Sequence, residues 1–335
     1  MNSAQALEAL RLSLRRQQCS LATERTYCGW LARYMRFLRL APESAATREK
    51  KVEAFLTDLA VNRRSASSQN QALNALVFFH THVLEQPLAG VDALRARRPQ
   101  RVRVAPPRHV TRAFIEEIED TPAQPIRLVA RLLYGCGLRL SEALNLRLKD
   151  VDPHGRRIWI RDAKHRKDRV VALPRTLTNA LADQMARAEA LWREDFRERV
   201  PVPLPGLLRN KRPHAEYSRD WRWLFPAENV CTDARQGRTV RWRCHEAIVQ
   251  REFARASARL RLCPALTPHH LRHAYATHCL EDGVNIRALQ AAMGHKSLET
   301  TMTYLHADPL SVASPLDVWT ASHAQSAFLR TEPQR

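Results

Sequence analysis

The stretch LTPHHLRHAYATHCLEDGVNIRALQAAMGHKSLETTMTYLH, which runs from Leu266 to His306, decides how the rest of the chain is interpreted. Thr267 and Pro268 are residue types favoured at the N-cap and the first position of a helix, so they predict a helix start. Positions three apart on a helix are neighbours on one face. The predicted helix therefore presents the imidazole of His269 beside the guanidinium of Arg272.

Further polar residues follow in the same stretch. A second helix is predicted over about 286–293; it ends at Gly294, which suits a left-handed C-cap, and His295 comes next. A third helical stretch carries Tyr304. A phenol beside Arg and His suits attack on a phosphodiester, because cations and hydrogen-bond donors stabilise the charge that develops on the phosphate oxygens. Arginine suits this role because its rigid fork of donors stays protonated.

The order His-x-x-Arg, then Gly-His, then a tyrosine resembles the tyrosine recombinase (phage integrase) family. The resemblance implies that Tyr304 attacks the scissile phosphate, giving a 3′-phosphotyrosine and a free 5′ hydroxyl. It also implies that Arg272 and an earlier arginine hold the non-bridging oxygens, while His269 and His295 donate hydrogen bonds or move protons. No cofactor is expected, since the energy of the broken bond is kept in the phosphotyrosine.

The earlier arginine is expected at Arg139. It follows Gly135-Cys-Gly137, a pair of glycines predicted to break one helix and to let the chain turn sharply into the next. Arg139 and Glu142 are then i,i+3 partners. An ordinary Arg–Glu helix pair is the alternative, and the later His-x-x-Arg favours the first arginine of a recombinase site.

The segment GRRIWIRDAKHRKDRVVALP, residues 155–174, is predicted to be the only β region, two runs of β-branched residues joined by a charged turn. In the resembled family a hairpin lysine protonates the leaving 5′ oxygen. Lys164 matches its place in the pattern Gly-Lys-Gly-x-Lys-Asp-Arg. Ala163 and His165 replace the flanking glycines, so Lys167 remains the alternative general acid.

A zinc site is the competing interpretation of the histidines. His269 and His273 are four apart on the predicted helix, and His278 lies close by. The motif lacks the glutamate of His-Glu-x-x-His, and no cysteine pair has zinc-finger spacing. We therefore expect no metal.

The charge of the chain points to DNA. Its 54 Lys and Arg exceed its 34 Asp and Glu, for a net charge of +20 in 335 residues. Residues 1–107 hold seventeen basic and eight acidic side chains, so +11 belongs to the remainder, and both halves are expected to touch phosphates. Seven cysteines without a Cys-x-x-Cys, and no apolar run of membrane-spanning length, predict a cytoplasmic protein.

The expected fold is mainly α with a small β-hairpin, in two domains that clamp DNA. Residues 1–93 predict a helical core-binding (SAM-like) domain, 94–110 a basic linker, 111–320 a catalytic domain, and 321–335 a C-terminal tail. In the first domain a helical stripe is expected in the core: Tyr27, Trp30, Leu31, Tyr34, Phe37 and Leu38. The linker arginines are expected along the DNA backbone, with a solvated hinge as the alternative: Arg95, Arg97, Arg98, Arg101 and Arg103.

Residues 201–229 form an insert that is longer than a connection needs. It is rich in Pro, aromatic and Arg residues. Together with the sequence SPLD, which follows Tyr304, the insert resembles the integron integrases, a branch of the family. Bases that lie outside a stack bind aromatic faces or an Arg plane. We therefore expect the insert to contact DNA, although a minicore that anchors it is the alternative; the candidate side chains are Arg219, Trp221, Arg222 and Trp223.

The resemblance implies an integron integrase, which captures and excises gene cassettes at a duplex integration site and at folded single-stranded cassette sites. The alternatives are a phage-type or chromosomal recombinase acting on duplex sites, and a catalytically silent DNA-binding relative. A homotetramer on DNA is implied, with the tail docking on a neighbouring protomer.

Overall fold

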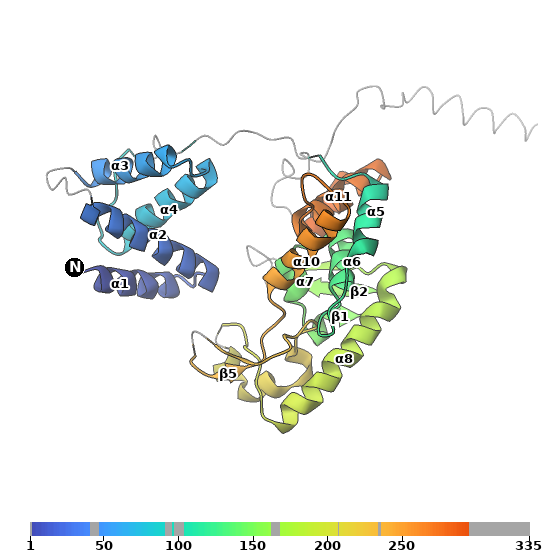
Figure 1. Cartoon of the computed structure of the whole chain (residues 1–335). Helices are drawn as coiled ribbons and strands as arrows, with labels where there is room; N and C mark the ends of the chain where they lie inside the picture. The colour runs from blue at the N-terminus through green and yellow to red at the C-terminus, as the bar shows by residue number, and fades with distance from the viewer. Residues whose placement is uncertain are drawn as a thin grey trace, which may run out of the picture. The chain divides into compact units, whose positions relative to one another are not determined.

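The computed structural model describes residues 2–40, 47–90, 96, 104–161, 168–206, 208–233 and 236–294. The chain divides into two units, Met1–Arg103 and Val104–Arg335 (Figure 1). Within the described ranges, no helix combines the length and the apolar character needed to cross a bilayer.

The first unit is a bundle of four helices: α1 (Ser3–Arg16), α2 (Leu21–Leu40), α3 (Arg48–Val61) and α4 (Ala66–His82). Helix α2 packs against α1 and α4 through the stripe expected from the sequence. Trp30, Leu31 and Tyr34 are buried in the core of this unit, and Tyr27, Phe37 and Leu38 are partly buried against it. Ser20, whose hydroxyl accepts the amide N–H of Thr23 at 3.1 Å, precedes the first turn of α2.

Helices dominate the second unit as well. They are α5 (Arg108–Glu117), α6 (Ile126–Cys136), α7 (Leu140–Leu144), α8 (Thr178–Arg197), α9 (Leu208–Lys211), α10 (Glu246–Arg259), α11 (Pro268–Glu281) and α12 (Ile286–Met293). Helix α6 is buried along most of its length and packs against α5, α10 and α11. It is the centre of this unit's core.

Glycine 135 does not break a helix, contrary to the expectation from the sequence. Helix α6 continues through it to Cys136 and ends at Gly137. A Cβ on Gly135 would lie 3.2 Å from Pro174 and 3.5 Å from Leu177. Gly135 is therefore in the helix because its neighbours pack closely against it, and only Gly137 makes the turn.

A three-stranded antiparallel sheet, in the order β1-β2-β3, contains the predicted hairpin. Its strands are β1 (Val151–Asp152), β2 (Arg157–Ile160) and β3 (Arg169–Ala172). Side chains alternate between the two faces of a strand, so Ile158 and Ile160 are buried while Trp159 lies on the other face, half-buried. Strand β1 and a second small sheet, β4 (Cys231–Thr232) with β5 (Thr239–Val240), show that the hairpin is not the only β structure.

The insert is joined to the core of the second unit. The amide of Leu148 donates to the carbonyl of Arg222 at 2.9 Å, and the amide of Leu224 donates to the carbonyl of Leu146 at 2.8 Å. Leu224 and Phe225 are fully buried in the main hydrophobic cluster. The insert is therefore packed as part of the second unit.

Candidate active site

Arg139 is presented by a turn that only glycine fits. Gly137 ends α6 in the left-handed conformation, with φ 62°. A Cβ at this position would also collide with the ring of Tyr275. Glycine is thus required for the backbone conformation and for the close approach of the ring. The chain then passes through buried Leu138, and Arg139 becomes the N-cap residue of α7.

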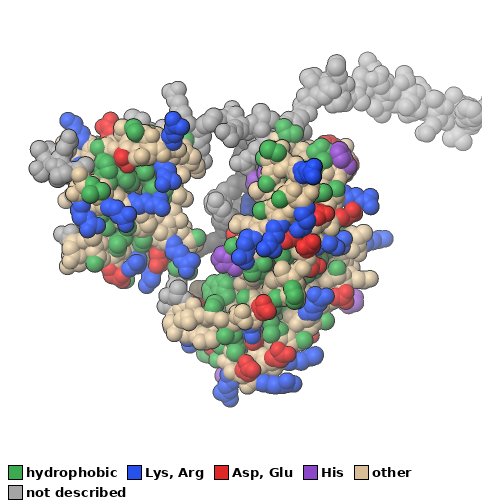
Figure 2. Space-filling view, in the orientation of Figure 1, with side chains coloured by type: hydrophobic (Ala, Val, Ile, Leu, Met, Phe, Trp, Pro, Cys, Tyr) green, Lys and Arg blue, Asp and Glu red, His purple; other side chains and the backbone are tan. Residues whose placement is uncertain are grey.

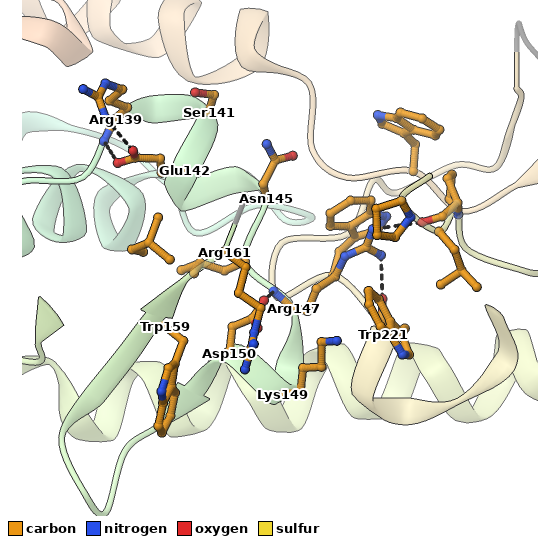
Figure 3. A pocket seen from close by; sticks show the side chains of 17 residues that line it. Arg139, Ser141, Glu142, Asn145, Arg147, Lys149, Asp150, Trp159, Arg161 and Trp221 are labelled. Atoms are coloured by element: carbon orange, nitrogen blue, oxygen red, sulfur yellow. Dashed lines mark hydrogen bonds and ion pairs between the residues drawn. The ribbon is translucent and has the colours of Figure 1, made fainter. Parts of the chain in front are cut away.

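Arg139 is bonded to Glu142, as the i,i+3 spacing predicted. Its Nη1 donates to Oε1 of Glu142 at 2.6 Å, and its backbone N–H donates to Oε2 at 2.8 Å. The Arg139 side chain is 33% exposed, whereas that of Glu142 is 8% exposed. Glu142 therefore holds one side of Arg139 (Figure 3), while a third of the Arg139 side chain stays accessible.

Arg272 reaches the same carboxylate from helix α11. Its side chain is buried and donates to two backbone carbonyls, those of Gly137 and Met293. Its Nη1 lies 3.6 Å from Oε2 of Glu142. The turn between α6 and α7 and the C-terminal end of α12 are therefore both bonded to one arginine.

A third arginine, Arg169 on β3, completes this cluster. Its Nη1 and Nη2 donate to the two carboxylate oxygens of Glu142 at 3.0 and 2.7 Å. Burial raises the pKa of Glu142, but the hydrogen bonds from Arg169 and from the backbone of Arg139, together with their charges, outweigh it and lower the pKa to about 2. Glu142 is therefore ionised at neutral pH and holds three arginines from three separate elements.

Helix α11 begins as the sequence predicted. Thr267 is the N-cap and Pro268 the first helical residue. The amide of Thr267 donates to Nδ1 of His270 at 3.0 Å. His269 is exposed in the first turn, three positions before Arg272. Arg139, His269 and Arg272 are the predicted catalytic residues that fall within the described ranges.

Helix α12 also has its predicted limits, and Gly294 ends it in the left-handed conformation with φ 63°. The residue after it, His295, is outside the described residues. So are the other predicted site residues of the hairpin turn, the linker and the C-terminal part: Lys164, Lys167, Tyr304, Arg95, Arg97, Arg98, Arg101 and Arg103.

One of the histidines considered as zinc ligands, His278, has another partner. His278 is buried, and its Nδ1 lies 2.9 Å from the hydroxyl of Tyr134. Burial lowers the pKa of His278, and the charge of Arg108 adds to this effect. Among the described residues, no group of three His, Cys, Asp or Glu side chains is arranged to hold a metal ion.

A groove of about 470 Å³ runs from Arg139 to the insert (Figure 3). Its aromatic walls are Trp159 from β2, Trp221 and Trp223 from the insert, and Trp242. Nζ of Lys149 lies 3.0 Å from the centroid of the Trp221 ring. The groove therefore combines planar apolar faces with cations, as nucleic-acid sites do.

Two of the predicted DNA contacts prove to be interior residues. Arg222 is buried, with Nη1 at 3.2 Å from Oδ2 of Asp195, and Trp223 is buried with its Nε1 donating to the carbonyl of Arg241. Both side chains are therefore held by contacts inside the protein, although Trp223 also borders the groove. Trp221 is half-buried and faces the groove, and Arg219 pairs with Glu189.

Some residues of the groove and the cluster were not predicted from the sequence. Arg169 could have been found from the sequence, because Asp168 and Arg169 match the Asp-Arg at the end of the pattern Gly-Lys-Gly-x-Lys-Asp-Arg. Trp159 could have been found too, since the alternation in Arg-Ile-Trp-Ile places it opposite the buried isoleucines. No sequence pattern indicated Lys149 or Arg147. Lys149 lies over Trp221 and Arg147 over Trp223, and both tryptophans are distant in the chain.

Comparisons with known proteins identify the family of this chain. The phage integrase family matches residues 108–310, and the phage integrase N-terminal SAM-like domain matches residues 6–89. An integrase/recombinase of Escherichia coli is 38% identical over 326 residues, covering 95% of this chain and 94% of the relative. The tyrosine recombinase XerD of Agrobacterium fabrum is 29% identical over 269 residues, covering 76% and 75%.

Solved structures share the fold. The XerH site-specific recombinase bound to difH substrate, a pre-cleavage complex, has a TM-score of 0.60 at 19% identity over 91% of this chain and 82% of that one. The Tn1549 transposon integrase in complex with a circular intermediate DNA has a TM-score of 0.58 at 16% identity over 96% and 98%. The expected fold class is confirmed. This chain belongs to the phage integrase family, the tyrosine recombinases, and is a site-specific DNA recombinase.

Proposed function

We propose that the catalytic residues are those expected from the sequence: Arg139, Lys164, His269, Arg272, His295 and Tyr304. The observation that supports this proposal is the pairing of Arg139 and Arg272 with Glu142. The two arginines come from helices far apart in the chain and meet at one carboxylate. Arg139 keeps donors open to the groove. In this proposal the two guanidinium groups hold the non-bridging oxygens of the scissile phosphate.

In the proposed reaction the phosphoryl group passes from the 5′ oxygen to the phenol oxygen of Tyr304. The phenol oxygen of Tyr304 attacks phosphorus, and its proton passes to solvent or to a nearby base. The bond from phosphorus to the 5′ oxygen breaks, and Lys164 gives that oxygen a proton, with Lys167 as the alternative donor. His269 and His295 hydrogen-bond the phosphate or move protons. Reversal of these steps on a new 5′ hydroxyl rejoins the strands.

The nucleophile is tested with a nicked suicide substrate, which traps the covalent intermediate. Wild-type protein should form a covalent protein–DNA adduct that survives denaturation. Tyr304→Phe keeps the ring and loses only the phenol oxygen, so it should bind the same DNA and form no adduct. If the Phe variant forms the adduct at the wild-type rate, Tyr304 is not the nucleophile. If wild-type protein binds and forms none, the chain is a silent DNA-binding relative.

DNA is proposed to be held by both units. Lys and Arg side chains are spread over the visible face of each unit (Figure 2). We assign residues 1–93 to core binding, 94–110 to a backbone-tracking linker and 111–320 to catalysis. Four protomers on two DNA sites, with the 321–335 tail of one docked on the next, complete this proposal.

We further propose that the protein is an integron integrase. The support is the insert together with the groove that it lines. Trp221 from the insert and Trp159 from β2 face this groove with Lys149 and Arg161. A folded single strand leaves some bases outside its stack, and such a base would lie against these rings. A perfectly paired duplex hides its bases and would place none of them against these rings.

Binding to two DNAs separates this proposal from a phage-type or chromosomal recombinase that uses duplex sites. Trp221→Ala should weaken binding to a folded single-stranded cassette site by about 1–3 kcal/mol and leave binding to a paired duplex nearly unchanged. Phe196→Ala is the control, because Phe196 is an exposed ring on α8 outside the groove. Both titrations are made at one salt concentration. Equal losses on the two DNAs would favour the duplex-site recombinase.

A further inference from the structure

Arg169 is a buried arginine to which the proposed reaction gives no role. It is the first residue of β3, and its side chain is 9% exposed. Its two terminal nitrogens donate to the two oxygens of Glu142, and its Nε donates to the carbonyl of Ala292 at 2.7 Å. Such a fork fixes the orientation of the carboxylate as well as its charge.

The bonds of Arg169 join three elements that lie next to proposed catalytic residues in the chain. Glu142 lies on α7, next to Arg139. Strand β3 follows the 162–167 segment, which contains Lys164. Ala292 is in the last turn of α12, which leads through Gly294 to the next residue, His295. A Cβ on Gly294 would lie 3.0 Å from Nη1 of Arg169, so this end of the helix is packed directly on the guanidinium.

The bonds to Glu142 also bear on the position of Arg272. A carboxylate offers about four acceptor positions. Arg169 occupies two of those on Glu142, and the side chain and backbone of Arg139 occupy two more. Arg272 pairs with the same carboxylate at a longer distance, 3.6 Å, and donates to the backbone carbonyls of Gly137 and Met293. Without Arg169, Glu142 would have positions free to draw Arg139 and Arg272 away from a phosphate.

We propose that Arg169 is a positioning residue for DNA cleavage: it holds Glu142 and the end of α12 so that Arg139 and Arg272 keep the geometry that binds the scissile phosphate. This inference rests on the proposed roles of Arg139 and Arg272. Because Arg169 is buried, it acts on the rate of cleavage and contributes little to DNA affinity.

The test compares Arg169→Ala and Arg169→Lys with wild type in single-turnover cleavage of the nicked substrate at saturating DNA. A displacement of about 1 Å costs up to about 100-fold in rate, so both variants should cleave roughly 10- to 100-fold more slowly, with DNA affinity within about twofold. Lysine should not rescue, since an ammonium cannot donate as a planar fork. Arg157→Ala is the matched control, an exposed arginine on the paired strand β2, and should cleave as wild type does.

A double-mutant cycle separates positioning through Glu142 from a general loss of structure. Glu142→Gln alone should slow cleavage, and adding Arg169→Ala to it should cost much less than in the wild-type background. Thermal melts keep the assays below the unfolding range, and Arg169→Lys retains the buried charge if the Ala variant does not fold. Wild-type cleavage by both Arg169 variants, or additive losses in the cycle, would overturn this inference. Absence of adduct with wild type would instead refute the proposed function.

Discussion

Asp195 and Arg241 form a buried ion pair between helix α8 and the segment that follows the insert, with Nη2 of Arg241 at 2.7 Å from Oδ1 of Asp195. The same carboxylate accepts Nη1 of Arg222 at 3.2 Å. The side chain of Asp195 is 2% exposed, so two buried guanidinium groups depend on one carboxylate. This triad ties the insert, through Arg222, and the segment after it, through Arg241, to α8.

Removal of the Asp195 carboxylate should destabilise the second unit strongly. Asp195→Ala leaves Arg222 and Arg241 buried without their shared partner, which costs about 3–5 kcal/mol in free energy of unfolding. Urea unfolding followed by circular dichroism measures it. Glu189→Ala is the control, because its partner Arg219 is 40% exposed and such pairs contribute less than about 1 kcal/mol. Similar losses in the two variants would contradict the importance of the buried triad.

The low pKa of Glu142 predicts an acid-sensitive stability. Its folded pKa of about 2 is below the usual 4.5, so the ionised form contributes stability at pH values above about 4.5, and this contribution is lost as the pH falls toward 2. The difference corresponds to roughly 3 kcal/mol. Between pH 7 and pH 3, Glu142→Gln should therefore lose less stability than wild type in urea titrations. Parallel losses would mean that Glu142 does not titrate in this range.

Gly137→Ala should unfold the turn that presents Arg139. An alanine at φ 62° is strained, and its Cβ would collide with Tyr275, so a loss of at least about 2 kcal/mol is expected. Gly29→Ala is a matched control in the middle of α2. Its Cβ would meet nothing within 4 Å, and it should stabilise the protein by about 0.5–1 kcal/mol. Thermal denaturation of both variants provides the comparison.

The choice between the two hairpin lysines is settled by the leaving group. Lys164→Ala should slow cleavage of an ordinary substrate by about 100- to 10,000-fold. It should not slow cleavage of a substrate whose leaving group is a 5′ thiolate, because a thiolate departs without a proton. Lys167→Ala should behave as wild type on both substrates. The reverse pattern in single-turnover assays would assign the acid to Lys167.

Elements with strong local signals were predictable. Helix α12 and the start of α11 have their predicted limits because capping residues and helical periodicity agree there. Strand β1, with two residues, is too short to show an alternation. The expected helix break at Gly135 was wrong, because a glycine that allows close packing within a helix looks the same in the sequence as one that ends a helix.

The pairings within the site were only partly predictable. Arg139 and Glu142 are three residues apart, so helical spacing alone predicts their contact. Arg222 pairs with Asp195, 27 positions earlier, and an arginine in a basic stretch resembles a phosphate-binding residue until the fold supplies its partner. Trp221 and Trp223 alternate, yet only the tertiary packing determines which ring enters the core.

Two backbone hydrogen bonds join the insert to the segment that precedes the sheet. They link Leu148 with Arg222 and Leu146 with Leu224. Phe225 completes the same hydrophobic cluster as the helices. Deletion of residues 201–229 would therefore remove Leu224 and Phe225 from the hydrophobic core of the second unit. A shortened chain would lose part of its hydrophobic core. The role of the insert is therefore better tested by single substitutions of its exposed side chains than by deletion.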